Sequence, residues 1–177
     1  MNLFVKELPT VILIDGEPYG IHTDFRVWMR FCDTFEKWDQ EADLDIGFVF
    51  TDRIPALRTP KDMRAVLDFA YPPAELPKSS GEDGGRILDY RIDADYIYSA
   101  FLSQYGIDLT ETDLHWHKFY ALLRGISKGT RLHEIMGYRS YDGQDKEYIR
   151  LRNMWELPLI QTAAEKRKSE EFDKYFD

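Results

Sequence analysis

The feature that most constrains the fold is an apolar stripe at helical spacing in the second half of the chain. The stripe recurs every three or four residues and consists of Ala94, Ile97, Tyr98, Phe101, Leu102 and Tyr105. Gly106 follows it directly, and glycine commonly ends helices because it tolerates a left-handed backbone. The pattern therefore predicts a helix that ends at Gly106 and turns one face toward the core.

Helical patterns continue from this point toward the C-terminus. Thr110 and Asp113 resemble a capping box and predict a helix over about residues 111–124. A shorter helix is expected over about residues 131–138, and an amphipathic helix over about residues 145–155. The second half of the chain is thus predicted to be helical throughout.

The N-terminal segment has the pattern of strands instead. Residues 10–14 are short and rich in β-branched side chains, residues 15–16 are the turn pair Asp-Gly, and residues 19–22 provide a return strand. Pro18, at the start of the return strand, indicates an edge position. We predict a small β-hairpin within about residues 3–22.

Two further helices are expected between the hairpin and the middle of the chain. One covers about residues 25–39 behind a cap at Thr23 or Asp24. The other covers about residues 60–71 and begins with Thr59 as N-cap, followed by proline at the first helical position. The first carries many aromatic side chains and is predicted to pack against the core.

Length and composition favour one domain. The 177 residues are 44% hydrophobic and 15% aromatic, which is enough apolar material for one core. We predict a mainly α fold with a small N-terminal β-hairpin (α+β), as a single-domain helical bundle over residues 1–160. Residues 74–85 are predicted to form a mobile loop, and residues 161–177 a charged C-terminal tail. The predicted core is Trp28, Phe35, Phe101, Leu102, Trp116, Phe119, Leu122 and Ile135.

Charge is distributed unevenly along the chain. The net charge of −9 argues against general attraction to nucleic acid or to anionic lipid. Residues 1–100 carry 11 basic and 19 acidic groups, whereas residues 118–152 carry 8 basic and 4 acidic groups. This basic stretch is either a solvated helix face or a docking surface for an acidic partner, such as the N-terminal half of another copy.

The sequence contains no residue pattern typical of a catalytic or metal-binding site. His115 and His117 would project about 200° apart on a helix, so they cannot share a metal ion, and His115 is interpreted as a core histidine. Cys32 lies on the apolar stripe of the first helix and is interpreted as a small buried hydrophobe. Asp93 and Asp95 flank a helix start and are interpreted as structural. No catalytic residue, metal ligand or cofactor site is therefore predicted, and we expect the protein not to be an enzyme.

Four stretches in the second half resemble a known family. They are residues 95–101, 104–109, 114–125 and 134–139, and the Trp-Glu-Leu-Pro of residues 155–158 extends the likeness. Together they are similar to the bacteriophage Gp15 protein family, named after gene product fifteen of a temperate phage of Gram-positive bacteria. Many relatives have tryptophan where this chain has His117.

The resemblance implies a role in phage tail morphogenesis. Members of the family are commonly regarded as tail assembly chaperones or minor tail-assembly factors encoded close to the tape-measure protein. The resemblance brings no catalytic residues. It implies the tape-measure protein as partner and the host cytoplasm, in an infected or lysogenic bacterium, as the location. A homo-oligomer is compatible with the sequence.

Alternatives remain beside the chaperone. The chain could be a minor tail or connector component that stays in the virion, with the hairpin adding to a neighbour's sheet. As a nucleic-acid-binding regulator it would use the helices at 111–124 and 131–138, with Arg124, Lys128, Arg131 and Arg139. In the charged tail, Phe172, Tyr175 and Phe176 have helical spacing and are the candidate partner-binding residues, or they fold back on the body. No membrane segment is expected, because the apolar runs are too short to span a bilayer.

Overall fold

The structure is a computed structural model in which contacts within the chain define two compact units. The hairpin unit comprises Pro9–Tyr71 and Leu159–Asp177, and the helical unit comprises Met1–Leu8 and Pro72–Pro158. The residues that the structure describes are 7–38, 44–57, 59–72, 85–162 and 165. Nearly all of the predicted mobile loop and of the charged tail lies outside these residues, as does the N-terminal end of the predicted hairpin segment. The single-domain organisation stays a prediction.

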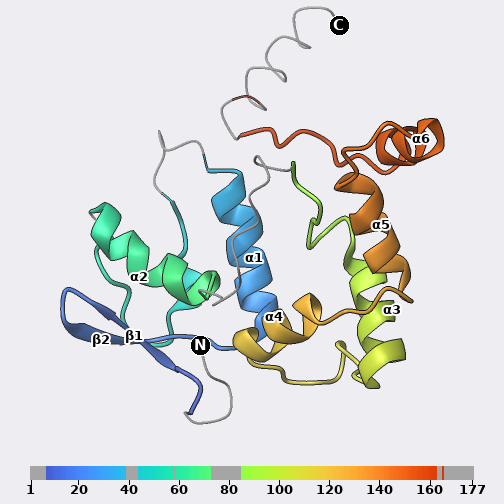
Figure 1. The fold of residues 1–177 in the computed structure, drawn as a ribbon. Coiled ribbons are helices and arrows are strands. Elements are labelled where there is room, and N and C mark those ends of the chain that lie inside the picture. The colour runs from blue at the N-terminus through green and yellow to red at the C-terminus, as the bar shows by residue number, and fades with distance from the viewer. Residues whose placement is uncertain (1–6, 39–43, 58, 73–84, 163–164, 166–177) are drawn as a thin grey trace, which may run out of the picture. The chain divides into compact units, whose positions relative to one another are not determined.

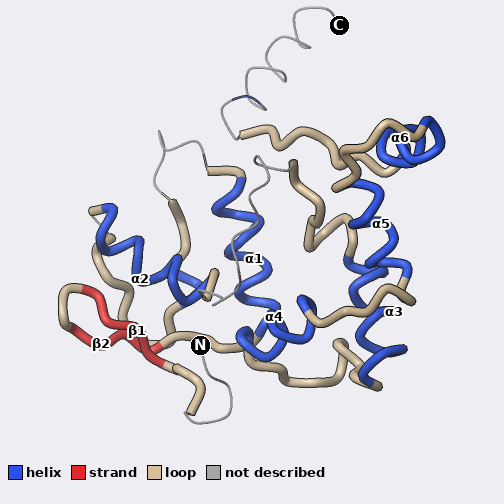
Figure 2. Tube along the Cα trace, in the orientation of Figure 1, coloured by secondary structure: helices blue, strands red, loops and turns tan. Residues whose placement is uncertain are grey.

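The hairpin unit begins with two antiparallel strands, β1 (Val11–Ile14) and β2 (Glu17–Gly20) (Figure 2). Asp15 and Gly16 both have positive φ, at 50° and 82°, which gives the tight two-residue turn predicted from the Asp-Gly pair. Pro18 lies inside the return strand opposite Leu13, next to the Ile14–Glu17 pair that closes the turn. Leu13 and Pro18 therefore form a non-hydrogen-bonded pair, in which a residue without an N–H is tolerated.

Two helices and a short 3₁₀ turn complete the described part of the hairpin unit. Helix α1 (Phe25–Glu36) is capped by the Asp24 side chain, which accepts a hydrogen bond from the Arg26 N–H. Helix α2 (Pro60–Ala70) has the predicted cap at Thr59, and Asp62 completes a reciprocal capping box. The 3₁₀ turn η1 (Gly47–Val49) precedes Phe50, which forms an isolated β-bridge with Ile21.

The hairpin unit has an aromatic core centred on Trp28, which is fully buried. Its ring centroid lies 4.3 Å from that of Phe69 on α2 and 5.4 Å from that of Phe31, and its indole N–H donates to the His22 carbonyl at 2.6 Å. Phe35 stacks on Phe31 in the last turn of α1 but is only half-buried. The core prediction is therefore confirmed at Trp28, whereas Phe35 lies at its margin.

The helical unit contains α3 (Ala94–Tyr105), α4 (Trp116–Arg124), α5 (Arg131–Arg139) and α6 (Lys146–Met154) (Figure 1). Helix α3 ends as predicted at Gly106, whose φ of 67° is left-handed. Helices α3 and α5 pack together, and α5 packs against α6. With six α-helices and one hairpin in the described residues, the predicted mainly helical α+β fold class is confirmed.

Aromatic side chains of α3 and α4 form the core of the helical unit. The rings of Phe101 and Phe119 stack with centroids 5.0 Å apart, and Trp116 lies 5.7 Å from Phe119. Four of the predicted core residues are fully buried in this unit: Phe101, Trp116, Phe119 and Ile135.

Two residues of the predicted core in this unit differ from expectation. Leu102 is 44% exposed, so its assignment to the core was wrong. The buried row of α3 runs through Ile97 and Phe101, and Leu102 lies on the flank that faces solvent. Leu122 is only half-buried, because the next residue, Leu123, takes the core position on α4.

The start of α4 also differs from the prediction. Asp108 accepts hydrogen bonds from the backbone N–H of Thr110 at 2.8 Å and from the Thr110 hydroxyl at 2.6 Å, which closes a local turn. Thr110 is thereby used in the turn and does not cap a helix. Helix α4 begins only at Trp116, with His115 as its N-cap.

Candidate functional site

The most elaborate polar arrangement in the described residues is a buried ion pair between Asp93 and Arg139. The Arg139 guanidinium forms two hydrogen bonds to the Asp93 carboxylate, at 2.6 and 3.0 Å. The two side chains are only 1% and 4% exposed. Asp93 stands at the N-cap position of α3, yet its carboxylate makes no capping bond there, because Arg139 of α5 and the Asp89 N–H use its oxygens.

Arg139 joins segments that are distant in sequence. Besides Asp93, it donates to the carbonyl of Trp155 at 2.7 Å and to that of Ile87 at 3.0 Å. Arg86 extends the network by donating to Asp89 at 2.9 Å and to the Pro158 carbonyl at 2.6 Å. We call the Arg139 and Arg86 contacts the arginine clamp. The clamp connects the residues that lead into α3 and the residues that follow α6 to Arg139 at the end of α5.

The electrostatics of the clamp are those of a structural element. Burial would raise the pKa of Asp89, but the N–H groups of Ile92 and Arg91 and the Arg86 charge more than offset it and leave that pKa below its usual range. Each of these charges is turned toward a partner within the chain, so the clamp connects segments of the helical unit. Asp93 is therefore structural, as predicted, and its partner Arg139 was not foreseen.

His115 does not have the role that the sequence analysis assigned to it. His115 is the half-buried N-cap of α4, where its Nδ1 accepts a hydrogen bond from the His117 N–H at 3.0 Å. His117 is the buried one, at 4% exposure. The interpretation of His115 as a core histidine was wrong, because the helix begins one residue after it and has Trp116, Phe119 and Leu123 on its buried face.

The thiol of Cys32 is buried in the folded state. Burial raises its pKa to about 12, so the nucleophilic thiolate is not formed at neutral pH. This confirms Cys32 as a small buried side chain of α1. Among the described residues, no group of three or more His, Cys, Asp or Glu side chains is placed to hold a metal ion.

The sequence-predicted binding residues cannot be placed, since Phe172, Tyr175 and Phe176 lie outside the described residues. A different apolar surface is visible on the outer face of the hairpin. Val11 and Leu13 of β1 are 45% and 65% exposed, whereas Ile12 and Ile14 alternate with them and are buried. Pro18, opposite Leu13, is also exposed. We call Val11, Leu13 and Pro18 the hairpin face.

The β2 strand of the hairpin is engaged by contacts within the chain. Next to β2, the Thr51 N–H donates to the Gly20 carbonyl at 3.0 Å, and Arg53 reaches Glu17 and the Pro18 carbonyl. These contacts occupy the β2 edge. A strand edge with an apolar face is a recognised place for another chain to add a strand. The hairpin face therefore resembles an interaction surface. The sequence shows residues 11–14 only as an unbroken apolar run, and the structure shows which of these side chains are exposed.

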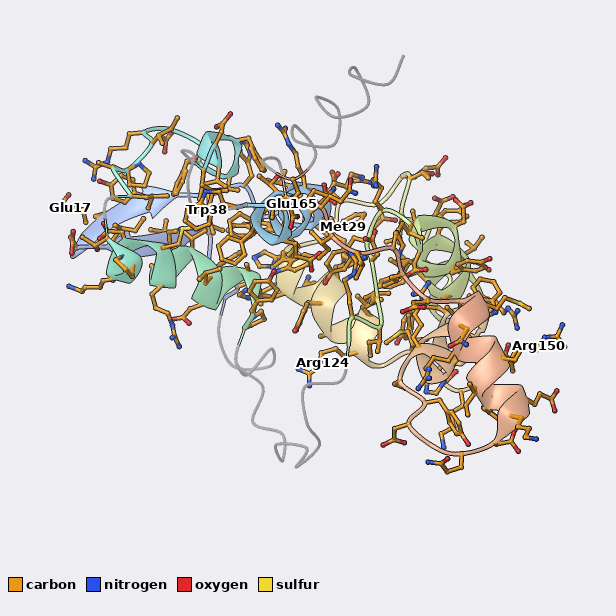
Figure 3. The ribbon with its side chains drawn as sticks, turned by 90° about the horizontal axis from the view of Figure 1, so that it is seen from above. Glu17, Met29, Trp38, Arg124, Arg150 and Glu165 are labelled. Carbon is orange, nitrogen blue, oxygen red and sulfur yellow. The ribbon has the colours of Figure 1, made fainter. Side chains whose placement is uncertain are left out.

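The basic stretch 118–152 is less uniform than its charge count implied. Arg139 is buried in the arginine clamp, and Arg131 pairs with Glu134 at 2.7 Å. Arg124 points away from the ribbon in Figure 3. Arg139 is therefore not available to contact DNA, which removes one of the four residues that a helix-turn-helix interpretation needs. None of the helices that the structure describes has the length and hydropathy required to cross a bilayer.

Comparison with known proteins places the chain in one family. The family described as Bacteriophage Gp15 protein matches residues 4–157, most of the chain. The match ends within the segment held by the arginine clamp, next to Pro158. No curated protein and no solved structure matches the chain. The resemblance inferred from the second half is thereby confirmed over both units, and membership indicates a phage structural or morphogenesis protein. The chain belongs to the bacteriophage Gp15 protein family.

Proposed function

We propose that this protein is a non-enzymatic tail assembly factor, a tail assembly chaperone that binds the tape-measure protein. The observation that carries the proposal is the family match over residues 4–157. The site of action would be the host cytoplasm of an infected or lysogenic bacterium, before the tail is complete.

The surface of the described residues supports a binding role. A chaperone has to hold an aggregation-prone partner through many moderate contacts and then release it, which favours accessible apolar side chains over a deep pocket. Exposed apolar side chains occur in both units, among them Leu13, Ile54, Leu102, Tyr148 and Met154. The polar groups of the arginine clamp, in contrast, are already satisfied within the chain.

Co-expression with the tape-measure protein of the same phage tests the proposal. We expect a soluble complex on size exclusion with mass detection, and precipitation of the tape-measure protein when this chain is omitted. A tape-measure protein that precipitates regardless, while this chain elutes alone, would remove the proposal's support.

The hairpin face favours a second candidate, a minor tail or connector component that remains in the virion. Its exposed Val11 and Leu13 could pack permanently against a neighbour while the β1 backbone adds to that neighbour's sheet. Mass spectrometry of purified particles separates the two candidates, because a chaperone is absent from finished particles and a component is present at fixed stoichiometry.

A further inference from the structure

The charge of α4 and of the turn after it is opposite in sign to the net charge of the chain. Residues 114–133 carry four basic side chains and no Asp or Glu, in a chain whose net charge is −9. Arg131 is paired with Glu134. The other three, Lys118, Arg124 and Lys128, are exposed and have no ion pair within the described residues. We call these three the α4 basic surface.

The backbone that presents this surface is held in place. Gln104 of α3 donates to the Gly125 carbonyl at 2.9 Å and accepts from the Ser127 N–H at 2.8 Å. The Tyr105 hydroxyl donates to the Leu122 carbonyl at 2.8 Å, and the Thr130 hydroxyl donates to the Ser127 carbonyl at 3.1 Å. Because the turn is fastened to α3, little backbone freedom would be lost when a partner binds it.

Some of the other cations in the described residues are paired or balanced locally. Several exposed ones in the hairpin unit have a carboxylate partner, such as Arg64 with Asp68 at 2.7 Å. On α6, Lys146 and Arg150 stand among Asp142, Asp145 and Glu147 in the sequence, so their charge is balanced locally. The α4 basic surface has no ion pair within the described residues, which suits it to a carboxylate-bearing partner.

The complementary surface is present on the same chain. Residues 38–52 carry five acidic side chains and no Lys or Arg. Within the described part of this stretch, Asp45 and Asp52 are exposed on either side of η1. Asp45 accepts only a long bond from the Gly47 N–H at 3.4 Å, and Asp52 accepts from the Thr51 hydroxyl at 3.2 Å. Neither carboxylate has an ion pair among the described residues. The cations nearby have other contacts: Arg53 pairs with Glu17, and the Arg30 guanidinium lies 3.9 Å from the ring centroid of Phe48 in η1.

We propose that two copies of this protein associate head to tail, with the α4 basic surface of one copy against the acidic surface of Asp45 and Asp52 on the next. The contact joins different surfaces of identical chains and therefore generates rings or open chains of copies. Copies of the protein are always present together, and each copy carries both complementary surfaces. The inference does not depend on the tape-measure protein as partner.

Sedimentation analysis of the full chain over a range of concentrations tests the proposal. We expect association at about 0.05 M salt that is lost at about 1 M salt, where charges are screened beyond about 3 Å. Lys118→Glu/Lys128→Glu and Asp45→Lys/Asp52→Lys should each weaken self-association by about tenfold or more. An equimolar mixture of these two variants should associate as tightly as the original, because each supplies the surface that the other lacks.

The matched control is Lys146→Glu/Arg150→Glu on α6, which makes the same change in net charge and should leave self-association unchanged. Circular dichroism verifies that each variant is folded. A chain that stays monomeric at low salt, an equal loss in the α6 control, or a mixture that fails to associate would each overturn the proposal. A monomer that binds labelled duplex DNA through Lys118 and Lys128 would overturn it and assign the surface to nucleic acid.

Discussion

The two units keep their ion pairs in different environments. In the hairpin unit, pairs such as Lys61 with Asp15 are 83% and 66% exposed and lie on the surface around an aromatic core. In the helical unit, Asp93 and Arg139 are almost completely buried and hold together segments that lie far apart in the sequence. A surface pair contributes little to stability, whereas a buried pair becomes costly as soon as one partner is removed. Substitutions of ion-pair residues should therefore lower the free energy of unfolding more in the helical unit than in the hairpin unit.

The largest effect is expected at the core of the helical unit. Phe101→Asp removes a fully buried ring and places a charge among Phe119 and Tyr105, which should lower the free energy of unfolding by about 5 kcal/mol or more. Leu102→Asp, one residue on and 44% exposed, should cost at most about 1 kcal/mol. Urea unfolding followed by circular dichroism measures both, and similar losses would contradict the assigned faces of α3.

The next effect compares a buried pair with a surface pair directly. Arg139→Leu strands the Asp93 carboxylate and should cost about 3–5 kcal/mol. Arg64→Leu, which removes an exposed pair from α2 of the hairpin unit, should cost about 0.5 kcal/mol or less. Hydrogen exchange resolved by peptide should show the first loss in the helical unit. Equal losses of unfolding free energy in the two variants would mean that the Asp93 carboxylate is solvated or is paired with another group.

A smaller effect is expected in the aromatic core of the hairpin unit. Trp28→Phe keeps an apolar ring near Phe69 but removes the N–H that donates to the His22 carbonyl. A buried acceptor without its donor costs about 1–3 kcal/mol, to which the lost ring volume adds. Thermal unfolding should show the decrease, with Trp38→Phe as a control at a half-buried position. A neutral Trp28→Phe variant would contradict the role of this hydrogen bond.

The smallest expected effect is the dependence of stability on acidic pH. Hydrogen bonds from the hydroxyl and N–H of Thr110 lower the pKa of Asp108, and the pKa of Asp89 is also lowered. Groups with a lower pKa in the folded state stabilise it above their unfolded pKa, about 3.9 for Asp, and the contribution disappears as pH falls through the folded value. Melting temperatures between about pH 5 and pH 2 should fall less steeply for Asp89→Asn and Asp108→Asn. Unchanged slopes would exclude both carboxylates as the source.

The features predicted from sequence were those that neighbouring residues determine. The Asp15-Gly16 turn, the Thr59 cap and the end of α3 at Gly106 each depend on a few adjacent residues, and all three were correct. The start of α4 was missed because Asp108 competes for the Thr110 hydroxyl, and the choice between the two arrangements depends on packing. The periodicity predicted the apolar stripe of α3 but not which of its residues are most deeply buried. That depends on Phe119 of α4, which stacks on Phe101.

The arginine clamp could not be predicted from sequence patterns, for a different reason. Arg139 was counted as one of many exposed basic residues, and a partner 46 positions away leaves no local signal at either end. The exposed hairpin face was foreseen only as an edge strand. The α4 basic surface was visible as a charge count, but the structure was needed to subtract Arg131 and Arg139 from it.

The arginine clamp also has a consequence for the order of folding events. Its contacts join residues separated by 46, 52 and 72 positions, whereas each helix of this unit closes over neighbouring residues. Closing long loops costs entropy before any contact forms, so the helices should appear early and the clamp late. Substitutions in the clamp should then accelerate unfolding while leaving the refolding rate nearly unchanged. The clamp would therefore determine the unfolding rate, and with it the lifetime, of the folded helical unit.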